Sequence, residues 1–216
     1  IARTVLLTFI GVLSFNLSYR LRSFDALEIL ASTDSLTGLK NRRYFFELAN
    51  LEFERSQRYA SKLCMVIADI DNFKHINDTF GHAQGDEALK LCADILTKGT
   101  RNIDIVCRLG GDEFAIILRN VDEVKAMELA EAHRVLLDGS SFVFAKQSYS
   151  IYGSFGVAMM DVANMTSGDV LANADIACHI AKRGGRNRSH LYEQSSDEKN
   201  IMGSELGWTK RLREAM

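Results

Sequence analysis

Helical and extended patterns alternate along most of this chain, and that alternation constrains the fold more than any other feature of the sequence. Apolar residues recur every three or four positions, as on one face of a helix, in residues 41–59, 84–98, 122–137 and 170–182. Short apolar runs typical of strands lie between them, at residues 63–70, 105–109, 114–118, 142–147, 150–159 and 189–193. Strands interleaved with helices predict a single sheet with helices packed over it, an α/β (α+β) fold.

Two consecutive glycines predict where one pair of strands turns. Gly110 and Gly111 separate the runs IVCRL and FAIIL, and glycine supplies the backbone angles that a tight turn needs. We therefore expect an antiparallel hairpin whose tip carries the adjacent acids Asp112 and Glu113.

The overall charge excludes one class of partner. Among 216 residues, 26 Lys and Arg stand against 28 Asp and Glu, a formal net charge of −2. Bulk charge therefore gives no attraction to nucleic acid or to an anionic bilayer, and any contact with phosphate must be local. We expect no nucleic-acid partner.

The cysteines predict neither a disulfide framework nor a zinc site, because none of the four belongs to a CxxC pair. Cys64, Cys92 and Cys107 lie in apolar runs, and we interpret the cysteines as reduced core residues of a cytoplasmic protein. His133 lies on the apolar stripe of its helix and is interpreted as a core histidine rather than a ligand.

The N-terminal segment does not follow the same alternation. Residues 4–15 form an apolar run that is too short to span a bilayer alone, because a spanning helix needs about 20 residues. A core strand is favoured there, with the end of a transmembrane segment as the alternative. Over residues 16–33 the pattern predicts a connector helix that pairs with a second copy of itself or rests on a domain. Its apolar positions are Leu17, Leu21, Phe24, Leu27 and Ala31.

The first acids of interest close the strand LCMVIADID. A strand alternates its faces, so Ile67, Asp69 and Asp71 share one face, and the acids arrive at its end. One interpretation is structural: Asp71 or Asn72 caps a helix that begins near residue 73, and Asp69 is solvated at the rim of the sheet. The other is a metal or substrate site, and the DxD pattern alone leaves the two balanced.

The GGDEF tip favours the second interpretation. If the strand that ends at Asp69 lies beside the hairpin, Asp69, Asp112 and Glu113 form an oxygen cage suited to Mg²⁺. The two glycines also let a phosphate or ribose approach the backbone. Such an arrangement suits nucleotidyl transfer, in which one metal ion activates a 3′ hydroxyl and positions it on an α-phosphate while another neutralises the departing pyrophosphate.

Several separated motifs together resemble one known family. They occur in order as DSLTGLKNRRYF at residues 34–45, DIDNFKHINDTFGHAQGD at 69–86, RLGGDEF at 108–114, SFGVA at 154–158 and AKRGGRN at 181–187. Over residues 34–193 the chain is similar to the GGDEF domain, the diguanylate cyclase family. The resemblance implies a palm-like, ferredoxin-type fold with a mostly antiparallel central sheet, as in nucleotide cyclases. It also implies conversion of two GTP into cyclic di-GMP and two pyrophosphates.

The family's roles fall on matching positions of this sequence. By resemblance, two Mg²⁺ or Mn²⁺ ions are held by Asp69, the Ile70 carbonyl, Asp112 and Glu113. Asn77 and Asp86 match the guanine-reading positions, where a carboxylate accepts from the N1 and N2 hydrogens that adenine does not offer. Phosphate contacts are implied at a helix start, which favours anions, and at a later clamp, and these residues are Asn72, Phe73, Lys74, Lys182 and Arg186. Lys74 also joins the catalytic group.

An RxxD pattern is formed by Arg101 and Asp104, and residues 105–109 separate it from Gly110. This spacing matches the family's inhibitory product site. Arginine can donate a pair of hydrogen bonds to guanine or phosphate, and aspartate can accept from the guanine edge. An ordinary ion pair at a helix end is the alternative. The spacing favours the inhibitory site, so cyclic di-GMP is expected to be an inhibitor as well as the product.

The implied reaction has a symmetry consequence. The product contains two equivalent phosphodiester links related by a two-fold axis, so two domains that each hold one GTP must face each other. We therefore expect a catalytic homodimer, with the connector helix setting how often the half-sites meet. Two other functions stay open: a silent GTP-binding domain that regulates an attached cyclic di-GMP phosphodiesterase, and a dimerising scaffold that binds only product through Arg101 and Asp104.

The motifs predict a chain of four parts. Residues 34–194 form the GGDEF domain, preceded by the connector helix at 16–33 and the end of a sensory domain or transmembrane segment at 1–15. NLS at residue 16 resembles the exit of a PAS domain, and GWTKRLREAM at 207–216 resembles the first helix of an EAL domain. Residues 195–216 would therefore hold a linker and the start of an EAL domain. We expect a cytoplasmic fragment of a PAS-GGDEF-EAL signalling protein, with a membrane anchor as the upstream alternative. His179 departs from the family pattern but replaces none of the catalytic residues named above.

Overall fold

The computed structural model describes residues 31–144, 147–160, 165–194 and 196–197. The expected strand at 4–15, all but the last residues of the connector helix at 16–33, and the EAL-like segment at 207–216 lie outside these residues. Within the described ranges, none of the helices combines the length and the apolar character needed to cross a membrane.

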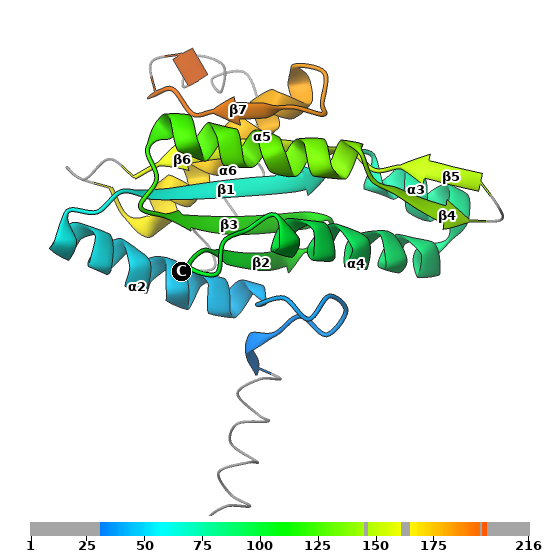
Figure 1. Cartoon of the computed structure of the whole chain (residues 1–216), viewed down its shortest axis with the longest axis horizontal. Helices are drawn as coiled ribbons and strands as arrows, with labels where there is room; N and C mark the ends of the chain where they lie inside the picture. The colour runs from blue at the N-terminus through cyan, green and yellow to red at the C-terminus, as the bar shows by residue number, and fades with distance from the viewer. Residues whose placement is uncertain (1–30, 145–146, 161–164, 195, 198–216) are drawn as a thin grey trace, which may run out of the picture.

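Five strands form the central sheet: β1 (Leu63–Ile70), β2 (Ile105–Gly110), β3 (Glu113–Arg119), β6 (Gly153–Met159) and β7 (Ser189–Leu191). Their order across the sheet is β2, β3, β1, β6, β7 (Figure 1). The central β1 pairs antiparallel with both β3 and β6, and β2 pairs antiparallel with β3, while β7 runs parallel to β6. The predicted mostly antiparallel α/β sheet is confirmed.

Helices cover both faces of this sheet. One face packs against α4 (His82–Lys98) and α5 (Glu123–Asp138), and the other against α2 (Arg42–Tyr59) and α6 (Ser167–Arg183). The short α3 (Phe73–Phe80) follows β1 at the end of the sheet where β1 stops (Figure 1).

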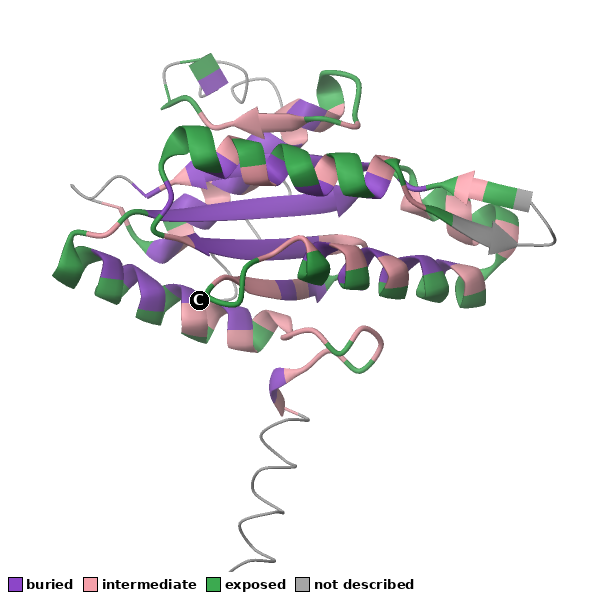
Figure 2. Cartoon of the chain, in the orientation of Figure 1, coloured by how far each residue is buried: buried purple, intermediate pink, exposed green. Residues whose placement is uncertain are grey.

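The two faces of β1 feed two separate hydrophobic cores, and β1 is buried along its whole length (Figure 2). The core under α4 and α5 receives Cys64, Val66, Ala68 and Ile70. The core under α2 and α6 receives Leu63, Met65 and Ile67. The period of two expected from the sequence is confirmed, because successive side chains of a strand point to opposite faces.

Capping side chains of Asn41, Asp122 and Thr166 determine where α2, α5 and α6 begin. Asn41 accepts from the Tyr44 N–H at 3.1 Å at the start of α2. At α6, Thr166 and Asp169 form a reciprocal capping box. This box starts α6 at Ser167, three residues before the predicted boundary at residue 170.

Three strands, rather than the two expected extended segments, connect α5 to α6. β4 (Ser141–Phe144) and β5 (Gln147–Ser150) form a separate two-stranded hairpin, and β6 begins only at Gly153. The predicted strands at 142–147 and 150–159 were therefore wrong about where one strand ends and the next begins. No signal in the sequence marks the turn between β4 and β5, because residues 141–152 contain no glycine or proline. The Phe80 and Tyr149 rings, with centroids 4.3 Å apart, attach this hairpin to α3.

A single glycine lets α6 approach the sheet closely. A Cβ at Gly156 in β6 would overlap the Ala174 carbonyl oxygen and the Cys178 backbone nitrogen of α6. A larger residue at this position would push the helix away from the sheet. The close approach brings the C-terminal end of α6, which carries Lys182, toward the end of β1.

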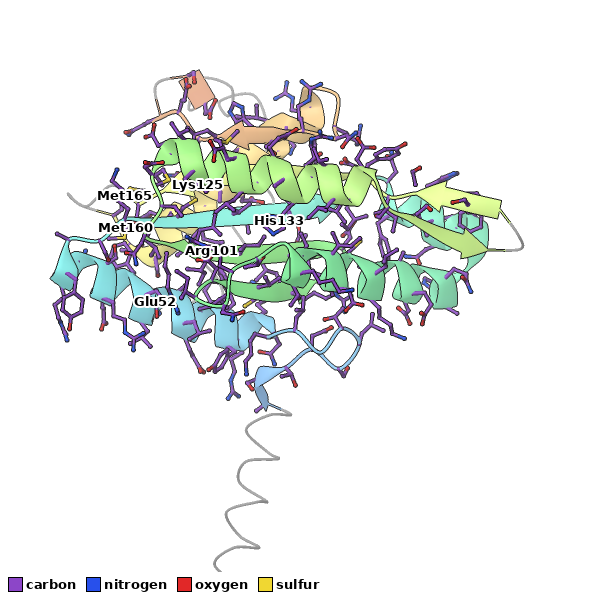
Figure 3. The ribbon with its side chains drawn as sticks, viewed as in Figure 1. Glu52, Arg101, Lys125, His133, Met160 and Met165 are labelled. Atoms are coloured by element: carbon purple, nitrogen blue, oxygen red, sulfur yellow. The ribbon has the colours of Figure 1, made fainter. Side chains whose placement is uncertain are left out.

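The thiols and one histidine belong to the core. Burial raises the pKa of the Cys64, Cys92 and Cys107 thiols to about 12, and it raises the pKa of Cys178 well above its ordinary value. All four are free and buried. Both ring nitrogens of His133 (Figure 3) lie within hydrogen-bond distance of backbone carbonyls of α4 and α5. The predictions of buried free cysteines and a core histidine are confirmed.

Candidate active site

The end of β1 meets the turn between β2 and β3. Asp69 and Glu113 are partners in the register of β1 with β3. One step further along β1, the Ile70 N–H donates to the backbone carbonyl of Asp112 at 3.2 Å. The strand that ends in the first acids therefore lies beside the hairpin, which is the condition that the sequence analysis required for a shared site.

The turn itself has an open backbone. Gly110 and Gly111 have φ angles of 142° and 54°, which favour glycine, and a Cβ at either position would meet nothing within 4 Å. The Arg108 guanidinium donates to the Gly111 carbonyl at 2.7 and 3.0 Å and to the Asp34 carboxylate at 3.0 Å. Arg108 thus ties the turn to the DSLTG segment, a role that the sequence did not reveal.

A lysine from α6 reaches this acidic edge. Lys182 Nζ lies 2.5 Å from Asp69 Oδ2, and Asp69 is only 6% exposed. The alternative in which Asp69 is solvated at the rim of the sheet is therefore wrong. A carboxylate this buried needs a cationic partner, and Lys182 supplies one.

Burial and mutual repulsion favour the protonated forms of these acids. Burial raises the pKa of Asp69 to about 6, although Lys182 opposes the rise. Burial, followed by the charges of Asp69, Asp175 and Asp112, raises the pKa of Glu113 to about 7. The positive charge near these carboxylates is thus too small to keep all of them ionised at neutral pH.

A fourth acid, Asp175, belongs to the same surroundings and was missed by sequence reasoning. It lies on α6 seven residues before Lys182, so two helical turns bring both to one side of the helix. Burial raises the pKa of Asp175 to about 6, although the charge of Lys182 opposes the rise. The sequence did hold one sign of its position, because Asp175 lies between Ala174 and Ala177, which belong to the buried stripe of α6.

The donors of this edge fit a divalent cation. Carboxylates with raised pKa values gain from a nearby cation, and an ammonium group already lies against Asp69. Among the residues that the structure describes, no three Asp, Glu, His or Cys side chains form a ready-made metal cage. Mg²⁺ usually takes one or two protein carboxylates and completes its shell with water and substrate phosphates. The shared cage of Asp69, Asp112 and Glu113 stays a prediction.

Asp71 and Asn72 do not cap α3, so the structural interpretation of the DxD pattern is also wrong on this point. Asn72 precedes α3 with a φ of 56°, and its side chain makes no capping hydrogen bond. Asp71 is buried and accepts from the Ser154 Oγ–H at 2.7 Å and from the Asn187 N–H at 2.9 Å. These two partners on distant segments hold the carboxylate in the interior of the protein.

The residues predicted to contact phosphate lie on two segments that flank the end of β1. Asn72 and Phe73 lie at the start of α3, and Lys74 follows them with an exposed side chain. Lys182 lies in the last turn of α6, and Arg186 follows it in an exposed loop. The structure therefore brings both predicted groups to the acidic edge, although they are far apart in the sequence.

The predicted guanine-reading residues come together where α3 packs against α4. Asn77 lies on α3, and Asp86 lies on α4 next to Gly85. A Cβ at Gly85 would overlap the Asn77 Oδ1 and would lie 3.2 Å from the Phe73 Cζ. Asn77 therefore packs directly over Gly85, beside the residue with which it is expected to read guanine.

The RxxD pair lies at the opposite end of β3 from Glu113, because Arg101 (Figure 3) contacts the backbone of Arg119, the last residue of β3. Arg101 donates to both Asp104 carboxylate oxygens at 2.6 and 2.9 Å, and to the Arg119 carbonyl at 2.9 Å. Since β3 runs from Glu113 to Arg119, the pair lies about 20 Å from the acidic edge, at about 3.4 Å per residue. The contact is compatible with both an ordinary ion pair and a product site.

The raised pKa values predict how stability depends on pH when metal ions are absent. In the unfolded chain Glu113 and Asp69 titrate near 4.5 and 3.8, whereas in the folded protein they hold their protons up to about 7 and about 6. At these two acids the folded state binds more protons between these limits, so their contribution to the free energy of unfolding is expected to fall as the pH rises from about 4 to 7. Asp34, Glu131 and His133, whose pKa values are lowered, contribute in the opposite direction.

Denaturant titrations in the presence of a chelator measure this pH dependence. Glu113→Gln removes one titrating group, so this variant should show a shallower fall than the parent. A variant whose pH dependence of stability matches that of the parent would contradict the raised pKa of Glu113.

The fold and the acidic edge together define a palm-like domain of the nucleotide-cyclase type. The family described as "Diguanylate cyclase, GGDEF domain" matches residues 31–188. The chain belongs to the GGDEF domain family.

Named relatives and solved structures agree with this assignment. A diguanylate cyclase of Vibrio cholerae is 38% identical over 173 residues, covering 80% of this chain and 53% of the relative. The response regulator PleD of Caulobacter vibrioides is 38% identical over 160 residues, covering 73% of this chain and 35% of the relative. The coiled coil and GGDEF domain of DgcB from Caulobacter crescentus, in complex with c-di-GMP, superimposes with a TM-score of 0.77 at 28% identity, covering 82% of this chain and 95% of that chain. The chain thus spans about half or less of these curated relatives.

Proposed function

We propose that this chain is a diguanylate cyclase domain that condenses two GTP molecules into cyclic di-GMP and two pyrophosphates. The observation that carries the proposal is the meeting of Asp69 with the GGDEF turn at an edge crowded with carboxylates. The names of the relatives support it, since a protein 38% identical to this chain is a diguanylate cyclase and a structural relative was solved with c-di-GMP.

In the proposed reaction, two Mg²⁺ or Mn²⁺ ions bind to Asp69, the Ile70 carbonyl, Asp112 and Glu113. When bound, these ions supply activation of a 3′ hydroxyl and neutralisation of pyrophosphate. In the metal-free protein, burial and the neighbouring acids raise the pKa of Glu113 to about 7. A bound cation would favour its ionised form, in which Glu113 would help to hold the second metal ion or contact the attacking hydroxyl.

The remaining residues would bind and orient GTP. Asn77 and Asp86 would read the guanine edge from the junction of α3 and α4. The backbone at Asn72 and Phe73, with the Lys74 ammonium, would hold phosphate oxygens at the start of α3. On the other side, Lys182 and Arg186 would bind the triphosphate.

Catalysis is proposed to require a homodimer, because each domain supplies only one half of a symmetric product. In the whole protein, we infer the end of a sensory domain or of a transmembrane segment at 1–15, a connector helix at 16–33 and the GGDEF domain at 34–194. Residues 195–216 would be a linker and the start of an EAL domain. These neighbours would set how often the half-sites meet, and the GGDEF domain itself would lie in the cytoplasm.

Turnover of GTP by the purified protein tests the proposal. With Mg²⁺ present we expect pyrophosphate and cyclic di-GMP, at a rate per protomer that rises with protein concentration, and a chelator should stop the reaction. Saturable GTP binding without product would favour the silent regulatory domain instead. Binding of cyclic di-GMP with no affinity for GTP would favour the scaffold.

Product inhibition at the RxxD site is part of the proposal and has its own prediction. Arg101→Ala should raise the cyclic di-GMP concentration that halves the rate by about 10-fold or more, because hydrogen bonds to charged groups contribute about 1.5–3 kcal/mol. The rate without product should not change, since Arg101 lies at the far end of β3 from Glu113.

Inhibition curves of Arg101→Ala and of Lys98→Ala make the comparison specific. Lys98 is an exposed cation at the end of α4, three residues before Arg101. Its removal tests whether any nearby positive charge matters. An Arg101→Ala curve that overlays the parent curve would assign Arg101 to the ordinary ion pair.

A further inference from the structure

A polar network joins the loop after α6 to the body of the protein, and it centres on Asp71. The two Asp71 carboxylate oxygens accept from the Ser154 Oγ–H of β6 at 2.7 Å and from the backbone N–H of Asn187 at 2.9 Å. Asp71 is 7% exposed and Ser154 is fully buried. None of the roles given above to the acidic edge uses Asp71.

The loop that receives the Asp71 bond has an unusual backbone. Arg186 and Asn187 have φ angles of 63° and 44°, consecutive left-handed residues that are not glycine. Such conformations persist only where the surroundings hold them in place. Here the Asn187 side chain supplies further bonds, accepting from Arg134 at 2.9 Å and donating to Asp138 at 3.3 Å.

The position of this loop matters because of what surrounds it. Lys182 in the last turn of α6 pairs with Asp69, two residues before Asp71 in the chain. Arg186 directly precedes the anchored N–H of Asn187. A shift of this anchor would therefore change the position of the Arg186 backbone relative to the edge where Lys182 meets Asp69.

We propose that Asp71 is a positioning residue that holds the loop at residues 184–188, so that Arg186 and Lys182 face the phosphates of a bound guanine nucleotide. The inference rests on the proposed function for its ligand. The hydrogen bonds that carry it belong to this chain and do not depend on a metal ion.

Two substitutions distinguish the hydrogen bonds of Asp71 from its negative charge. In Asp71→Asn, the amide oxygen can accept from the Asn187 N–H, while the amide NH₂ can donate to Ser154, whose hydroxyl both donates and accepts. Asparagine thus keeps both links without the charge. In Asp71→Ala both links are lost.

Binding of GMP and of GTP, the latter as its α,β-methylene analogue, from which the proposed reaction cannot release pyrophosphate, is measured by titration calorimetry in Mg²⁺ and tests the proposal. Because GMP lacks the outer phosphates, the ratio of the two affinities reports the clamp. Asp71→Ala should lower GTP affinity about 10–100-fold, because two hydrogen bonds to a charged group are lost, and leave GMP affinity within about 3-fold of the parent. Asp71→Asn should restore most of the ratio.

Ser154→Ala is the matched control. It removes one bond to the same carboxylate and leaves the Asn187 N–H bond, so it should lower thermal stability while largely keeping the affinity ratio. Amide hydrogen exchange at Asn187 adds a readout that needs no nucleotide. The amide should be protected in the parent and in Asp71→Asn, and should exchange faster in Asp71→Ala.

Each outcome decides between the proposals. A parental affinity ratio in Asp71→Ala, or unchanged exchange at Asn187, would overturn the positioning role while the proposed cyclase stands. Equal losses in Asp71→Ala and Asp71→Asn would assign the effect to charge and also overturn it. A parent protein that binds neither nucleotide would overturn the proposed function, and a protected Asn187 amide would then leave only a structural anchor.

Discussion

Replacing Asp112 with asparagine is expected to lower GTP turnover by more than about 100-fold. The change removes a proposed metal ligand, and even the loss of an outer-sphere partner costs about 10–100-fold. The fold should survive, because Asp112 lies in the turn between β2 and β3 and is linked to the Ile70 N–H through its backbone carbonyl, which asparagine keeps.

Without metal ions, we expect this variant to be at least as stable as the parent. The Asp112 carboxylate is one of the charges that raise the pKa of Asp69 and of Glu113, so its removal relieves repulsion at neutral pH. Acids kept close together at a cost to stability are typical of functional sites. Lost turnover together with an unchanged or higher unfolding midpoint would therefore identify Asp112 as functional.

The measurement compares GTP turnover and thermal unfolding on the same preparations. Asp94→Asn serves as the control, because Asp94 is an exposed acid on α4 and its removal changes the net charge equally. This control should keep the parental rate. Parental turnover in Asp112→Asn would instead remove Asp112 from the metal group.

The acidic edge could be predicted from local patterns. The alternation in β1 indicates which side chains share a face, and two glycines before two acids indicate a turn with an acidic tip. Only the assumption that β1 lies beside this hairpin was needed to bring Asp69 to Glu113, and the observed register agrees with it. The motifs of the family then indicated Lys182, which contacts Asp69 as an ion pair.

Contacts between distant segments could not be predicted in this way. Asp71 resembled a helix cap because capping is a local pattern, whereas its partners Ser154 and Asn187 lie 83 and 116 residues away. The position of Asp175 near Glu113 likewise depends on the close approach of α6 to the sheet, which Gly156 permits. Such features follow from the packing of whole elements and leave only weak signals in the sequence.

Gly85→Ala is expected to weaken GTP binding by about 5–150-fold, equivalent to about 1–3 kcal/mol for a hydrogen-bonding group displaced from its partner. Gly85 lies within α4, where alanine normally stabilises the helix by about 1 kcal/mol. Here the added Cβ would overlap the Asn77 Oδ1 and lie 3.0 Å from its Cγ and 3.2 Å from the Phe73 Cζ. These atoms belong to side chains, which can move without unfolding the protein.

The cost of Gly85→Ala should therefore fall on nucleotide recognition rather than on the fold. If the methyl group acts by displacing Asn77, then Asn77→Ala should cause a similar loss, and combining the two changes should add little to either. Affinities for GTP and ATP, measured on Gly85→Ala, on Asn77→Ala and on the double variant, test this coupling. Unfolding midpoints are measured on the same three variants. Losses that add fully would mean that Gly85 acts independently of Asn77, and a lowered midpoint with parental GTP affinity would mean that the close contact serves only packing.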